Sequence, residues 1–167
     1  THELNRHIAD NVLTLLKNDE ELLPLQISDS TKLSIVYLED FNYHTFDTTI
    51  NSFHKATSYS INSKTTPEQT DSILTSLTNS DIIITLVSGG VNQTKKNNYG
   101  ISQNTLDAIA KIQDLDKKNI LVLFANPYAL ASLDTLCEYN SLIMAYQNTV
   151  NLQRSVAQAL FGYRAFK

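Results

Sequence analysis

Short apolar segments alternate with stretches of helical periodicity along most of this chain, and this alternation restricts the fold more than any other feature. The segments are Leu33–Leu38, Thr57–Ile61, Asp81–Val87, Ile120–Ala125 and Leu142–Tyr146. Four of them are mainly apolar on both faces, which is typical of strands covered by helices on both sides. The connections between them are long enough for helical crossovers, which join parallel strands. The sequence therefore predicts an α/β domain.

The helical segments begin and end at residues with a clear capping role. Thr66-Pro67-Glu68-Gln69 can form a capping box, in which the Thr hydroxyl and the Gln amide satisfy free backbone N–H groups. Gly162 suits the left-handed end of the last helix. Further helices are expected at 46–55, after a Ser102 cap, at 127–135, and after a cap at Asn148 or Thr149. We predict a three-layer α/β/α sandwich with a flavodoxin-like, mostly parallel five-stranded sheet and the polar strand Thr57–Ile61 at an edge.

The first thirty residues have a different pattern. Leucine, isoleucine and valine recur at helical spacing, which predicts an amphipathic helix over 4–17. Leu22–Leu25 reads as an apolar linker that lies on a surface. We therefore divide the chain into an N-terminal helix and linker (1–30) and a sandwich domain (31–167). Because the chain opens at Thr1 and enters a helical pattern at once, we expect a fragment of a longer polypeptide.

Composition argues against several classes of function. The formal net charge is −4 and the basic residues are scattered, whereas a nucleic-acid binder usually carries a basic stripe. No segment has the roughly 18 consecutive apolar residues of a membrane span. Cys137 is the only cysteine, so no intramolecular disulfide is expected, and the four histidines lack zinc spacing. We expect no metal, no cofactor, no nucleic acid and no membrane partner.

The residues after each strand decide which chemistry this architecture can carry, because its ligands bind at the carboxyl ends of the strands. Glu39-Asp40 follows the first strand where a dinucleotide or flavin site needs glycine. A phosphorylated receiver domain would need an aspartate after the third strand and a lysine after the fifth, where Ser88 and Gln147 stand. Ser88-Gly89-Gly90 is also not a G-x-S-x-G nucleophile elbow. None of these sites is therefore expected.

Three sets of motifs, in the same order, resemble the C-terminal domain of family-3 glycoside hydrolases. The first is Asn11-Val12-Leu13-Thr14-Leu15-Leu16-Lys17-Asn18-Asp19 followed by Leu22-Leu23-Pro24-Leu25. The second is Phe124-Ala125-Asn126-Pro127-Tyr128-Ala129-Leu130. The third is Ala145-Tyr146-Gln147 with Ala157-Gln158-Ala159-Leu160-Phe161-Gly162. In that family another strand usually follows, so the resemblance implies that the C-terminal strand is truncated here.

The resemblance implies that the catalytic centre lies on another part of the parent protein. Family-3 enzymes carry their nucleophilic Asp on an N-terminal TIM-like barrel, and retaining hydrolysis also needs an acid near the scissile bond. In the β-glucosidase branch this acid is a Glu in the loop after the third strand. The corresponding loop, Ser88–Ile101, contains no Asp or Glu. The sequence therefore favours the β-N-acetylhexosaminidase branch, whose His-Asp pair lies on the barrel; the run Lys95–Ile101 also resembles that branch.

We accordingly expect no catalytic residue in this chain. It would be an accessory domain that packs against the barrel, roofs its mouth and is inactive alone, while the parent, a bacterial periplasmic or secreted enzyme, acts on a carbohydrate. Residues that could face the barrel or its substrate are Ser88, Gly89, Gly90, Lys95, Asn98, Tyr99, Asn126 and Gln147. Two alternatives remain open: an independent small-molecule or sugar-binding module that uses the crevice after the first and third strands, and a purely structural scaffold.

Overall fold

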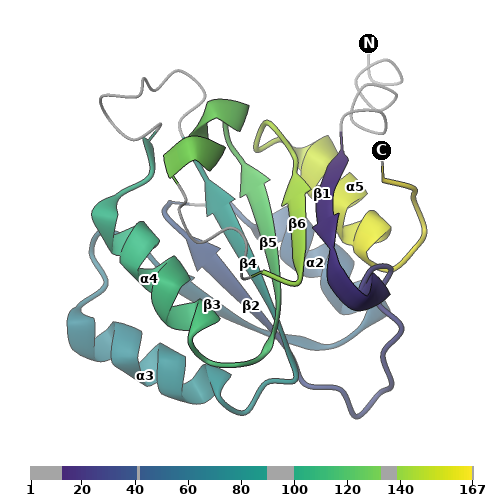
Figure 1. The fold of residues 1–167 in the computed structure, drawn as a ribbon. Coiled ribbons are helices and arrows are strands. Elements are labelled where there is room, and N and C mark those ends of the chain that lie inside the picture. Colours follow the sequence, from purple (N-terminus) through teal and green to yellow (C-terminus); the bar gives the residue numbers. More distant parts are fainter. Residues whose placement is uncertain (1–12, 41, 90–99, 133–138, 167) are drawn as a thin grey trace.

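The computed structural model describes residues 13–40, 42–89, 100–132 and 139–166. They form a six-stranded sheet with the strand order β1-β6-β5-β4-β2-β3 (Figure 1). The strands are β1 (Thr14–Asn18), β2 (Leu33–Leu38), β3 (Ala56–Ile61), β4 (Ile82–Ser88), β5 (Lys118–Phe124) and β6 (Ser141–Met144). The helices are η1 (Asp19–Glu21), α2 (His44–Phe53), α3 (Pro67–Leu77), α4 (Gln103–Gln113), η3 (Pro127–Ser132) and α5 (Val150–Leu160).

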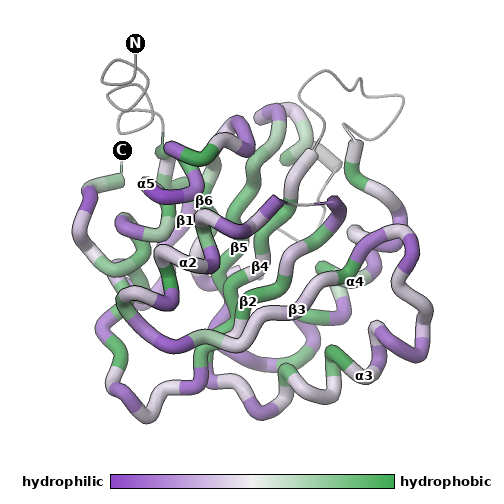
Figure 2. The backbone as a smooth tube through the Cα atoms, turned by 180° about the vertical axis from the view of Figure 1, so that it is seen from behind, coloured by the Kyte–Doolittle hydropathy of each residue, from purple (hydrophilic) through white to green (hydrophobic). Residues whose placement is uncertain are grey.

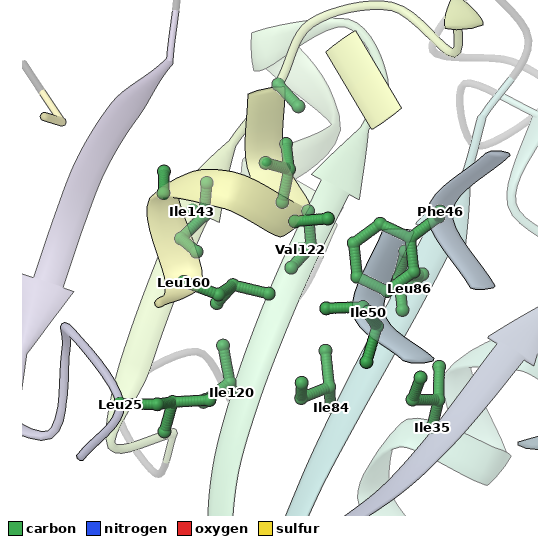
Figure 3. Packing of buried hydrophobic residues seen from close by; sticks show 14 of the residues in the cluster. Leu25, Ile35, Phe46, Ile50, Ile84, Leu86, Ile120, Val122, Ile143 and Leu160 are labelled. Atoms are coloured by element: carbon green, nitrogen blue, oxygen red, sulfur yellow. The ribbon is translucent and has the colours of Figure 1, made fainter. Parts of the chain in front are cut away.

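Helices cover both faces of the sheet because successive strand residues point to opposite sides. Ile35 and Tyr37 of β2 belong to a buried cluster with α2 and α5, whereas Val36 and Leu38 belong to a second cluster with α3 and α4. Figure 3 shows the first cluster, in which Phe46 and Ile50 of α2 and Leu160 of α5 lie over the strands. The tube in Figure 2 is green along β4 and β5, the two central strands that both layers cover. The predicted three-layer sandwich is confirmed.

The parallel part of the sheet has the predicted flavodoxin-like order. From β2 to β6 every neighbouring pair of strands is parallel, and counting these five strands along the chain gives the order 2-1-3-4-5. The polar strand β3 lies at one edge, as expected. The capping box at Thr66 is present, Ser102 and Thr149 cap α4 and α5, and Gly162 has a φ of 77°.

The predicted helix over 4–17 is wrong for its last residues, since Thr14–Asn18 is a strand. This strand, β1, pairs antiparallel with β6 and makes the sheet six-stranded rather than five-stranded. Leu15 packs against the buried cluster of α2 and α5, while Leu16 sits at a register shift and is exposed. Pairing with the free edge of β6 gives this short segment backbone hydrogen bonds, and these stabilise it more than its weak helix propensity does. Residues 4–12 of the predicted helix lie outside the described residues.

Two local expectations also need correction. The segment Leu22–Leu25 does more than lie on a surface, because Leu23 and Leu25 are buried in the core. The helix after β5 is described as the 3-10 helix Pro127–Ser132, and the remainder of the predicted range, 133–135, lies outside the described residues.

Candidate functional site

The carboxyl edge of the parallel strands, at the top of Figure 1, is the place where this architecture positions a site. The connection after β2 leads to α2 on one face of the sheet, and the connection after β4 leads to α4 on the other face. Between β2 and β4 the chain therefore leaves in opposite directions, and doubly wound sheets bind their ligands at such a point. Glu39, Ser88 and Gly89 are the residues next to it.

Glu39 joins the end of β2 to the beginning of α4. Its carboxylate oxygen Oε1 accepts hydrogen bonds from the Ser102 backbone N–H at 2.7 Å and from the Thr105 hydroxyl at 2.6 Å. The Ser102 hydroxyl also accepts a bond from the Thr105 N–H at 3.2 Å, so two side chains cap the same helix end. A negative charge is favourable at this position because free N–H groups and the helix dipole point toward it.

The backbone at Glu39 is left-handed, with a φ of 65°. Its N–H still donates to the Ile61 carbonyl at 3.0 Å, which holds the turn against the end of β3. No local pattern in the sequence indicates this role, because the partners of the carboxylate are 63 and 66 residues away along the chain. Only the strand order brings them together. Glu39 therefore secures the C-terminal end of loop 88–101 instead of standing free for acid chemistry.

A second polar group, centred on the buried side chain of Gln153, connects three strand-end loops. The Gln153 amide oxygen accepts a hydrogen bond from the Phe46 N–H at 3.0 Å. Its amide nitrogen donates to the Asn148 side-chain oxygen at 2.6 Å and to the Asn42 carbonyl at 2.5 Å. Asn148 in turn donates to the Ser88 hydroxyl at 3.5 Å. The chain segments at the ends of β2, β4 and β6 are thereby held together at this edge of the sheet.

The predicted site residues fall into two groups. Ser88 is half-buried at the end of β4 and takes part in the group around Gln153, and the Gly89 N–H donates to the Phe124 carbonyl at 3.1 Å. The Asn126 side-chain oxygen accepts the Tyr128 N–H at 3.1 Å and so begins η3, while Gln147 is exposed. Gly90, Lys95, Asn98 and Tyr99 lie outside the described residues. Whether any of these residues faces a barrel or a sugar stays a prediction.

The pKa shifts of described residues have structural causes. Burial raises the pKa of the Tyr139 phenol. Backbone N–H groups at the beginning of α3 lower the pKa of the exposed Glu68 carboxyl. A retaining glycosidase needs a carboxyl pair that shares one site, with one pKa raised for the acid. Burial also raises the pKa of the Tyr37 phenol, and among residues 13–40, 42–89, 100–132 and 139–166 none of these three shifts belongs to such a pair.

A large hollow lies at the opposite end of the sheet. It has a volume of about 1060 Å³ and is lined by the segment 20–27 together with residues before β4 and β5, such as Asp81 and Lys117. Because it faces the amino ends of the parallel strands, it is not where a doubly wound sheet binds its ligand. It is the space between the segment that follows β1 and the loops that enter the sheet.

Neither a metal centre nor a membrane span is found in the part of the chain that the structure describes. None of its side-chain groups brings together three or more His, Cys, Asp or Glu residues in a position to hold a metal ion. Its helices are also too short or too polar to cross a bilayer.

Comparisons with solved structures identify the fold. No protein-family model and no curated protein matches the sequence. The structure is similar to parts of a fungal multi-domain GH3 β-N-acetylglucosaminidase (15% identity, TM-score 0.77) and of a GH3 β-N-acetylglucosaminidase from Paenibacillus sp. FPU-7 (18% identity, TM-score 0.77). It is also similar to part of a β-glucosidase from Listeria innocua crystallised with isofagomine (16% identity, TM-score 0.65).

These likenesses cover nearly all of this chain and only a minor part of the other proteins. Each match includes 98% of the residues here, but 18%, 31% and 26% of the respective solved chains. The chain thus spans less than a third of the length of these proteins. The fold is that of one segment of GH3 glycosidases, in agreement with the resemblance in the sequence motifs.

Proposed function

We propose that the chain is the C-terminal accessory domain of a family-3 glycoside hydrolase, of the β-N-acetylglucosaminidase kind, and that it is inactive by itself. One observation carries the proposal: 98% of the chain superposes on segments of two GH3 β-N-acetylglucosaminidases with a TM-score of 0.77. The TM-score with the β-glucosidase from Listeria innocua is lower, at 0.65. The absence of Asp and Glu from loop 88–101 supports the same choice of branch.

The direction of β1 supports docking of the barrel at the carboxyl edge. Thr14 lies opposite Met144, the last residue of β6, so the polypeptide that precedes β1 reaches the sheet at this edge. A barrel N-terminal to this domain would then be connected at the same edge of the sheet at which β4 ends with Ser88. Large apolar side chains are exposed in the same region, Tyr128 after β5 and Val150 after β6, at 73% and 57% of their full area. A domain that docks at this edge would cover both side chains.

Two measurements test this proposal. The purified chain should show no turnover of p-nitrophenyl N-acetyl-β-glucosaminide, because the nucleophile and the acid would both lie on the barrel. Turnover by the chain alone would contradict the proposal. The reading frame upstream of Thr1 should encode a TIM-like barrel, and a different upstream domain would also reject the assignment.

The affinity of surface variants of this chain for the separate barrel would show which surface docks. When the barrel and this chain are expressed separately, the double change Tyr128→Ser and Val150→Ser should weaken their association at least tenfold, roughly the loss of two buried apolar anchors. Tyr163→Ser is the matched control, because Tyr163 is similarly exposed, at 69%, but lies after the C-terminal end of α5. Equal weakening by both changes would reject the carboxyl edge as the docking surface.

A further inference from the structure

An exposed tyrosine stacks on a buried one at the beginning of α2. The rings of Tyr43 and Tyr37 are 4.1 Å apart between centroids and 16° from parallel. Tyr37 is fully buried, and Phe46 supports it edge-on at 6.3 Å. Tyr43 is 40% exposed. Since Tyr37 stacks on one face of the Tyr43 ring, it fixes the orientation of that ring, and a ligand can approach only from the opposite face or the ring edges.

A polar surface adjoins this ring on the same side of the sheet. The register pairs Ser58 and Ser60 of β3 with Ile35 and Tyr37 of β2, so both serines point to the face that α2 occupies. Both are exposed, because β3 is an edge strand that α2 covers only in part. The face of β3 beside α2 therefore presents hydroxyl groups to solvent.

Asp47 connects the ring pair to these hydroxyls. Its carboxylate accepts hydrogen bonds from the Tyr37 hydroxyl, at 3.3 Å, and from the Ser58 hydroxyl. Burial, followed by the nearby Asp47 charge, raises the pKa of Tyr37, so its phenol remains a neutral donor at physiological pH. The Asp47 side chain is half-buried. It is thus held in place by two donors and can accept further hydrogen bonds from a ligand.

We propose that Tyr43, Asp47, Ser58 and Ser60, which we call the tyrosine ledge, bind a neutral saccharide. A fixed aromatic face suits the apolar C–H face of a pyranose ring, and a carboxylate beside hydroxyls suits its hydroxyl groups. The carboxylate disfavours an anionic ligand, and the hydroxyl-bearing strand disfavours an apolar protein partner. This site goes beyond the proposed accessory function, since it is formed by this domain alone.

The open shape of the tyrosine ledge sets the affinity that we expect. One ring face and a few polar groups bury only part of a sugar, so Kd should be on the order of 1 mM for a short oligosaccharide. Isotope-edited NMR of the 167-residue chain detects binding at this strength. The probes are N-acetylglucosamine trimer, cellotriose and, as the anionic comparison, trigalacturonate.

The neutral trimers should cause saturable shifts at Tyr43, Asp47 and Ser58, and trigalacturonate should cause none. Tyr43→Ala should weaken binding about tenfold, whereas Tyr43→Phe should stay within about twofold, because stacking needs the ring and not the hydroxyl. Ser58→Ala provides a second variant, at an exposed position, and should weaken binding about threefold.

Tyr163→Ala is the matched control. Tyr163 is also exposed and stacked, on Phe53 at 4.7 Å, but it lies at the opposite end of α2 from Tyr43. Equal loss of binding in Tyr43→Ala and Tyr163→Ala would overturn the proposal, as would the absence of saturable shifts at the ledge up to about 20 mM neutral trimer. The barrel takes no part in this titration, so its outcome is independent of the proposed accessory function.

Discussion

Replacement of Gln153 by Leu tests whether its three hydrogen bonds hold the carboxyl-edge loops together. Gln153 is 4% exposed, and its side-chain oxygen accepts a hydrogen bond from the backbone N–H of Phe46, which is fully buried. Leucine keeps a similar volume but leaves this donor without its partner, which costs about 1–3 kcal/mol. The acceptors on Asn42 and Asn148 are part-buried, so water can replace the amide there at lower cost.

We expect Gln153→Leu to lower the free energy of unfolding by about 1–3 kcal/mol, because a cost of about 1 kcal/mol at the two part-buried acceptors offsets the gain of about 1 kcal/mol from the more apolar side chain. Urea unfolding followed by circular dichroism measures this change, and the m-value should stay constant because the surface exposed on unfolding does not change. Gln158→Leu is the control: this half-exposed residue of the same helix accepts a hydrogen bond from Arg164 through its side-chain oxygen. Gln158→Leu should lower the free energy of unfolding by less than about 0.5 kcal/mol.

A decrease in the free energy of unfolding of less than about 0.5 kcal/mol in Gln153→Leu would refute the reasoning, because a buried N–H without a partner should destabilise the fold by more than that. Gln153→Glu sharpens the test, since it places a carboxylate against the two acceptors. Burial and these acceptors should raise the pKa of the introduced Glu above its unfolded value. The neutral form is then the one favoured by folding, so the variant should gain stability as the pH falls through the folded pKa.

Three other substitutions test the local structure, each by urea unfolding. Gly162→Ala should cost about 1–2 kcal/mol, since φ is 77° and the added Cβ would lie 3.1 Å from the Pro24 Cβ; no loss would mean that the turn relaxes freely. Thr66→Ala should cost about 1 kcal/mol through the capping box with Gln69, and Thr66→Ser should restore most of it. Glu39→Ala should cost about 1–2 kcal/mol by uncapping α4, and Glu39→Gln, which keeps an acceptor oxygen, should cost less than Glu39→Ala.

Local signals in the sequence were sufficient wherever the partners are close along the chain. The capping box joins Thr66 to Gln69, three residues away, and the left-handed Gly162 closes its own helix. The central strands were recognised because burial on both faces leaves a nearly continuous apolar run. These features require no knowledge of the remaining fold.

Local sequence patterns did not predict the structure where segments that are distant along the chain compete for the same hydrogen bonds or the same surface. Residues 14–17 have helical periodicity, yet the free edge of β6, more than a hundred residues later, turns them into a strand. The candidate site shows the same limit. Ser88 was selected because it ends a strand, but its connection through Asn148 to Gln153 depends on which helix lies beside which strand.

The order of apolar strands and capped helices in the sequence determined the α/β/α class, the parallel core and the polar edge strand. Only the tertiary structure decided which side chains meet at the carboxyl edge, where Glu39 caps a helix 63 residues away and Gln153 bonds Phe46 across 107 residues. The physical reason is the range of the interactions. Burial patterns and caps act within a few residues, whereas a polar contact between loops exists only after the sheet has fixed the strand order.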